Sequence, residues 1–182
     1  MKKFNVKNIV LAGLFLGIGL VLPFVTMQIP AIGNMLCPMH IPILLCGFIC
    51  GAPYGLIIGF ITPIFRGMLF GMPALLPNAA CMAFELATYG LVSGLLIRKM
   101  KYSILNLYVS LIISMIVGRI VWGLAATVIY HFLGMDFTVQ QFVTAGFVNA
   151  IPGILIQLII IPTIVDRVKE YAQITFAGEE SI

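Results

Sequence analysis

The stretch FITPIFRGMLF, residues 60–70, places one arginine inside an otherwise apolar run. A charged side chain at the centre of a bilayer costs about 2.5–3.5 kcal/mol on insertion scales. A chain keeps such a residue where it has a function or a partner, and not by chance. If this run crosses a membrane, Arg66 therefore marks a functional or ion-paired position at bilayer depth.

The composition of the whole chain indicates that the run does cross a membrane. Of 182 residues, 62% are hydrophobic and 9% are charged, whereas soluble domains carry roughly 45–50% apolar and about 25% charged residues. Apolar runs of the length that spans a bilayer as a helix recur along the chain. We therefore predict an all-α integral membrane protein. The net charge of +4 does not indicate nucleic acid binding, because the basic residues flank the apolar runs.

Six apolar runs are predicted to form a compact bundle of transmembrane helices. The N-terminal run is expected to be a retained helix and not a signal peptide, since no small-residue cleavage site follows it. We expect one transmembrane domain, residues 1–167, and a short cytoplasmic tail, residues 168–182. The predicted helices cover residues 6–24, 41–51, 53–71, 79–97, 104–132 and 140–165.

The distribution of basic residues predicts the orientation of the bundle. Of the ten Lys and Arg residues, two lie inside predicted helices and the others fall on one side of a six-helix arrangement. The positive-inside rule assigns that side to the cytoplasm, together with both termini. The flanking basic residues are Lys2, Lys3, Lys7, Arg98, Lys99, Lys101, Arg167 and Lys169.

Three ionisable side chains, Arg66, Glu85 and Arg119, lie deep within predicted helices, and Asn149 lies at a similar depth. Counted inward at about 1.5 Å per residue, they lie roughly 8–18 Å from the outer helix ends. All of them therefore occupy the outer half of the bundle or its middle. This clustering predicts a polar pocket that opens to the outside.

Further side chains are predicted to line the same pocket. Helical spacing places Tyr89 on the face of Glu85 and Trp122 on the face of Arg119. Prolines near Arg66 and Asn149 free backbone carbonyls that a ligand can use. The outer loops and helix starts add three candidate substrate-binding residues: Asn34, His40 and Asn78. For His40, the roles of helix-start residue and substrate ligand are both open.

The charges in the pocket leave two arrangements open. Either Arg66 or Arg119 pairs with Glu85 as a structural ion pair, or these groups contact a ligand. In both arrangements two arginines and one glutamate leave a residual charge of about +1 in a low-dielectric site. Asp136 at the outer rim or a bound anion can balance this charge. The surplus favours a ligand with one carboxylate or phosphate.

Motifs for catalysis, metal binding and nucleotide binding are missing from the sequence. No P-loop, HExxH or GxSxG motif occurs, and Glu85 has no second carboxylate at its depth. The four cysteines are interpreted as small buried hydrophobic residues. We therefore predict neither an enzyme nor a metal or cofactor site. The apolar inner half of the bundle favours ligand capture over a conducting channel.

The stretch MHIPILLCGFICGAPYGLIIGFITPIFRGMLFGMP, residues 39–73, followed by AFELATYGLVSGLL, residues 83–96, resembles the substrate-binding S components of energy-coupling factor (ECF) vitamin transporters. The resemblance covers roughly residues 6–167. It implies a subunit that captures a water-soluble vitamin or precursor outside the cell. It also implies partners in the plasma membrane of a prokaryote: a membrane coupling subunit and two ATPase subunits, which hydrolyse ATP in place of this chain.

The resemblance also implies a docking surface on the first helix. Many S components carry an Ala-xxx-Ala motif there that contacts the coupling subunit. This chain has Leu16 four residues after Ala12, with Gly13 and Gly17 one step along. We assign the expected docking role to Ala12, Gly13 and Gly17.

The sequence leaves alternatives open both for the ligand and for the function of the protein. The surplus positive charge favours pantothenate, and pyridoxine and riboflavin remain open. The competing functions are a self-sufficient secondary transporter of a small polar metabolite and a structural membrane protein with an internal ion pair.

Overall fold

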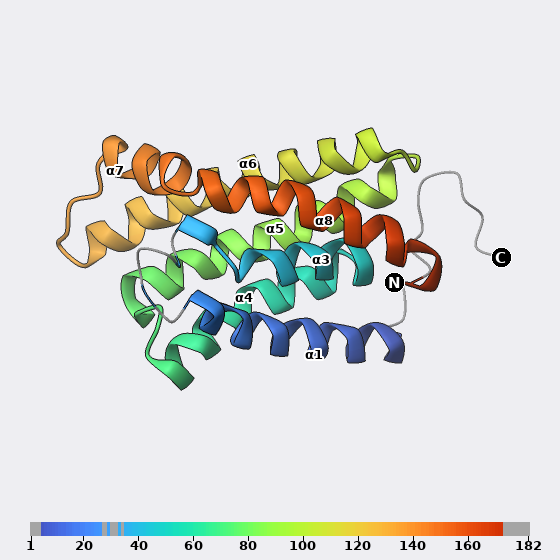
Figure 1. Ribbon diagram of the computed structural model, residues 1–182. Helices are drawn as coiled ribbons and strands as arrows, with labels where there is room; N and C mark the ends of the chain where they lie inside the picture. Colours follow the sequence, from blue (N-terminus) through green and yellow to red (C-terminus); the bar gives the residue numbers. More distant parts are fainter. Residues whose placement is uncertain (1–4, 27–28, 30–32, 34, 173–182) are drawn as a thin grey trace.

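The computed structural model describes residues 5–26, 29, 33 and 35–172, and within these ranges it is all-α, without a β-strand (Figure 1). The all-α membrane fold predicted from the sequence is confirmed. The elements are α1 (Val6–Val21), η1 (Leu22–Thr26), α3 (His40–Cys50), α4 (Ala52–Phe70), η2 (Leu75–Ala79), α5 (Ala80–Lys99), α6 (Ile104–Phe132), α7 (Val139–Val143), η3 (Thr144–Val148) and α8 (Ile151–Ala172).

Five of these helical segments are long and apolar enough to cross a membrane. They contain α1, α4, α5, α6 and α8. The apolar helix α3 has 11 residues, and all of them except Ile41 are buried. It lies inside the bundle, packed against α1, α4, α5 and α8. A short helix is tolerated there because its neighbours, and not lipid, surround it.

Glycines allow α3, α4 and α5 to approach closely at the centre of the bundle. A Cβ atom on Gly90 of α5 would lie 2.3 Å from the carbonyl carbon of Gly55 on α4. A Cβ atom on Gly59 would meet the carbonyl oxygen of Leu86 at 2.3 Å, and one on Gly47 would meet that of Gly90 at 2.5 Å. Small residues at such crossings stabilise membrane helix pairs through backbone contact.

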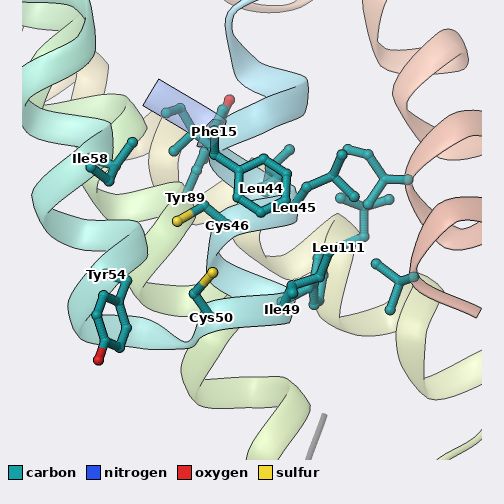
Figure 2. Close-up of a cluster of buried hydrophobic side chains, with 14 of the residues drawn as sticks. Phe15, Leu44, Leu45, Cys46, Ile49, Cys50, Tyr54, Ile58, Tyr89 and Leu111 are labelled. Atoms are coloured by element: carbon teal, nitrogen blue, oxygen red, sulfur yellow. The ribbon is translucent and has the colours of Figure 1, made fainter. Parts of the chain in front are cut away.

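Apolar side chains from α1, α3, α4, α5 and α6 fill the space around these crossings (Figure 2). Ile43, Leu44 and Cys46 of α3 have no solvent exposure. All four cysteines are buried and form no disulfide, as expected of small hydrophobic residues. Lipid is as apolar as this core, so the packing stabilises the bundle mainly through close contact.

The connections between helices lie at two opposite ends of the bundle. The start of α1, the junction of α5 with α6 and the end of α8 lie at one end, and α7 lies at the other (Figure 1). The first end therefore holds the flanking basic residues of the described ranges: Lys7, Arg98, Lys99, Lys101, Arg167 and Lys169. We call it the basic end.

The segment predicted as one helix over residues 140–165 is divided, and this prediction was wrong. It forms α7, the π-helical turn η3 and α8, with turns at Asn149 and Ala150. Pro152 explains the break, because it has no N–H to donate to the carbonyl of Val148 four residues earlier. A proline is tolerated in the first turn of a helix, which is where it lies in α8.

The C-terminal helix is longer than expected. We predicted a tail from residue 168, but α8 continues through Ala172. Residues 173–182 of that predicted tail lie outside the described part of the chain.

Candidate functional site

A cavity of about 590 Å³ is lined in part by Phe137 and Gln141, which lie next to and in α7, the helix opposite the basic end. Drug-sized ligands occupy pockets of roughly 300–1,000 Å³. Its walls come from η1, α3, α4, η2, α5, α6, α7, η3 and the segments that connect them. The polar and aromatic lining residues are His40, Arg66, Asn78, Glu85, Arg119, Trp122, Tyr130, Phe137, Gln141 and Asn149.

Glu85 of α5 is the centre of a buried polar cluster on the cavity wall. Its side chain is 1% exposed. Arg119 Nη1 of α6 lies 2.8 Å from Glu85 Oε1, and the Tyr89 hydroxyl donates a hydrogen bond of 2.9 Å to the same oxygen. Glu85 and Tyr89 are one helical turn apart, so they share a face of α5. The ion pair and hydrogen bond compensate for burial of the carboxylate.

His40 at the start of α3 completes this cluster. Its Nε2 atom lies 3.5 Å from Glu85 Oε1, which is longer than an ordinary N–H···O hydrogen bond of about 2.7–3.2 Å. Within the described ranges, neither ring nitrogen of His40 has a hydrogen-bond partner. The ring lies against that of Tyr89, with centroids 5.3 Å apart. A buried imidazole that makes no hydrogen bond is costly, so both ring nitrogens keep hydrogen-bonding capacity at the cavity wall.

Arg119 also contacts the segment that precedes α3. Its Nη2 atom donates to Cys37 Sγ at 3.7 Å. Cys37 is a non-glycine residue with a left-handed backbone, φ 46°. Burial raises the pKa of the Cys37 thiol, although the nearby Arg119 acts in the opposite direction. The thiol therefore stays neutral and leaves the charge of Arg119 to Glu85.

Arg66 lines the cavity without a carboxylate partner in the described part of the chain. Its side chain comes from α4, and the residue is 2% exposed. Nη1 donates a 2.5 Å hydrogen bond to the carbonyl of Leu20, near the end of α1. The guanidinium carbon lies 5.0 Å and 5.5 Å from the ring centroids of Phe24 and Phe70. These contacts hold the side chain and stabilise its charge in part, but no described residue places a negative charge beside it.

Aromatic rings cover the α6 side of the cavity. Trp122 stacks on Phe142 of α7, with centroids 5.9 Å apart and an interplanar angle of 22°. Phe137 lies edge-on to Trp122 at 5.7 Å and contacts Tyr130 at 5.2 Å. The rings therefore connect the α6–α7 segment to α6 and give the cavity an apolar wall beside its ionic groups.

Most of the candidate residues meet at this one cavity. Seven predicted residues line it: His40, Arg66, Asn78, Glu85, Arg119, Trp122 and Asn149. Tyr89 lies behind them and reaches the site through its hydrogen bond to Glu85. Asn34 lies outside the described residues. Of the two ion pairs that the sequence left open, the one between Arg119 and Glu85 forms. Asp136, which was expected to balance the charge from the outer rim, is exposed and does not line the cavity.

The predicted docking residues on α1 have different environments. Ala12 is 5% exposed and belongs to the apolar core. Gly13 and Gly17 are exposed, with no atom within 4 Å of a Cβ added at either position. An accessible small-residue surface on α1 therefore contains the two glycines and not Ala12.

The sequence analysis missed several lining residues. Tyr130 lies two turns beyond Trp122 on α6, so helical periodicity was a signal that could have found it. Phe137 and Gln141 come from the α6–α7 connection and α7. No periodic pattern marks them, since the direction of that segment depends on the break before α8.

Comparison with protein families matches residues 7–165 to the model for the ECF transporter, substrate-specific component. The chain belongs to this family. It is therefore a substrate-specific, or S, component of an ECF transporter and a multi-pass membrane protein. Comparison with curated proteins and with solved structures finds no match to it.

Membership of the family gives this S component a general role. It belongs to a class of transporter components that associate with a membrane ECF module and a small-molecule substrate. The family match does not name the substrate, so the substrate class has to be inferred from the residues that line the cavity.

Proposed function

We propose that this S component binds a water-soluble vitamin or vitamin precursor from outside the cell, in the cavity lined by Arg66, Glu85 and Arg119. The proposal rests on one observation: these buried ionic residues all line one cavity, and its volume suits a small ligand. Pantothenate is the favoured ligand because it carries one negative charge. Pyridoxine and riboflavin are the alternatives.

Transport by this protein is proposed to require partners. A membrane coupling subunit and two ATPase subunits would supply the energy, and the chain itself would use no cofactor and catalyse no reaction. The basic end would face the cytoplasm of a prokaryotic cell, by the positive-inside rule. The cavity at the opposite end would then open outward, as capture of an external nutrient needs.

Uptake into vesicles separates this function from that of a self-sufficient secondary transporter. The chain reconstituted alone is expected to give no concentrative uptake of radiolabelled pantothenate, even with an imposed ion gradient. Vesicles that also contain the coupling subunit, both ATPases and internal ATP should accumulate the label. Accumulation by the chain alone would establish the secondary transporter instead.

The exposed glycine surface of α1 is the proposed contact with the coupling subunit. Gly13→Leu is expected to leave ligand affinity unchanged and to lower the yield of the assembled complex at least tenfold. The reason is that a large side chain prevents close approach of a second helix. Co-purification with a tagged coupling subunit measures this effect.

Thr163→Leu is the matched control, because Thr163 is also exposed but lies on α8. It should assemble as the unmodified chain does. If the Gly13→Leu and Thr163→Leu variants gave the same yield of assembled complex, α1 would not be the docking helix.

A further inference from the structure

The two arginines of the cavity differ in what they contact. Arg119 forms an ion pair with Glu85 at 2.8 Å and also contacts Cys37. Arg66 is also buried by its exposed area, but its one hydrogen bond to a described residue goes to the carbonyl of Leu20. A guanidinium carries five N–H donors. Arg66 therefore keeps both its charge and most of its donors for a bound molecule.

The charge balance of the cavity points to a ligand with one negative charge. The charges of Glu85 and Arg119 cancel each other, and His40 adds no charge when its imidazole is neutral. The remaining charge is that of Arg66, with no described carboxylate within pairing distance. A buried charge without a partner is unfavourable. The planar guanidinium matches a carboxylate in a bidentate arrangement, which supplies the missing partner.

A second part of the cavity is arranged for a neutral group. His40 is 2% exposed, and both of its ring nitrogens lack hydrogen bonds to the described residues. Among the described residues, His40, Arg119 and Tyr89 all contact Oε1 of Glu85, and no described residue forms a hydrogen bond or ion pair with its Oε2. A neutral imidazole offers one donor and one acceptor. Together these atoms suit a hydroxyl or amide, which both donates and accepts.

We propose that the cavity recognises a two-ended ligand, in which Arg66 binds a single carboxylate and His40, with Glu85, binds a neutral hydroxyl or amide. This inference rests on the proposed function and names the substrate class of the same site. The class is a small monocarboxylic acid with a neutral hydrogen-bonding group, and pantothenate is one member. Cationic vitamins and dicarboxylates lie outside it, because either would leave an uncompensated charge.

Binding to the unmodified chain tests the carboxylate end of this ligand. Trp122 is the single tryptophan of the sequence and lines the cavity, so its fluorescence reports binding directly. The probes are pairs that differ in the carboxylate alone: pantothenate with panthenol, nicotinate with nicotinamide, and biotin with biotinamide. The acid of the recognised pair should bind about 10- to 100-fold more tightly, the range for a charge-assisted hydrogen bond.

Variants of the chain test whether Arg66 causes the preference for the acid over its neutral partner. Arg66→Gln should remove the preference for the acid and keep the affinity for the neutral partner, which also shows that the variant is folded. Arg66→Lys should restore part of the preference. Arg167→Gln, an exposed arginine of α8, is the matched control and should behave as the unmodified chain. His40→Phe should weaken both members of the pair by the same factor, at least tenfold.

The outcomes separate failure of this inference from failure of the proposed function. Equal affinity for acid and neutral partner, or tight binding of riboflavin, pyridoxine or thiamin alone, would overturn the two-ended ligand and leave vitamin capture in place. A preference that survives in Arg66→Gln would overturn the role of Arg66. Unchanged affinities in His40→Phe would overturn the role of His40. The absence of any vitamin binding would overturn the proposed function and this inference together.

Discussion

Replacing Arg119 with methionine is expected to abolish ligand binding and to lower the stability of the protein by about 3–5 kcal/mol, the typical cost of breaking a buried ion pair. The Glu85 carboxylate, 1% exposed and 2.8 Å from Arg119, would lose its charged partner. Methionine fills a similar space without the charge. Thermal unfolding in detergent measures the stability, and Trp122 fluorescence measures binding.

A second substitution shows whether the stability loss comes from the unpaired carboxylate. The double variant Arg119→Met with Glu85→Gln removes both charges and should regain most of the lost stability, while ligand binding stays absent. Contacting residues of this kind show coupling of about 0.5–3 kcal/mol in double-mutant cycles. Strictly additive losses would show that the two side chains do not stabilise each other.

Replacing Gly90 with alanine is expected to give the largest effect on the fold away from the cavity. The new methyl group would lie 2.3 Å from the Gly55 carbonyl carbon, a distance that backbone atoms cannot accommodate without moving α4 away from α5. Overpacking in a rigid core typically costs about 1–3 kcal/mol. The upper end of that range applies here, because the obstructing atoms are backbone. The melting temperature in detergent should fall accordingly.

Gly13→Ala provides the matched control for this effect, since nothing lies within 4 Å of a Cβ at that position. It should leave the melting temperature unchanged or slightly raised, because alanine is the better helix former by about 1 kcal/mol. Similar melting temperatures for the Gly90→Ala and Gly13→Ala variants would contradict the close crossing of α4 and α5.

The helices were predictable from the sequence where apolar runs have clear ends. The predicted bounds of α6 agree with the structure, since basic residues and Ser103 precede it and Leu133 and Gly134 follow it. The division before α8 was not predicted. The proline near Asn149, Pro152, was placed inside a single predicted helix, but whether a proline bends a helix or starts a new one depends on its neighbours in space.

The candidate site was predictable in outline because helical spacing and depth depend on the sequence alone. Glu85, Arg119 and Trp122 were expected at one pocket, and they line one cavity. The partner of each arginine was not predictable. It depends on how each helix is rotated about its axis, which the packing of α1, α4 and α5 determines. That packing places Arg66 against Leu20 and Phe24 and not against Glu85.

Native mass spectrometry of the purified chain, in the presence of a panel of water-soluble vitamins, tests the central claim most directly. We predict one bound vitamin per chain, with no coupling subunit or ATPase present, and loss of that ligand in the folded Arg119→Met Glu85→Gln double variant. A chain that binds no member of the panel, or a double variant that keeps its ligand, would contradict the claim that these buried ionic groups form the vitamin site.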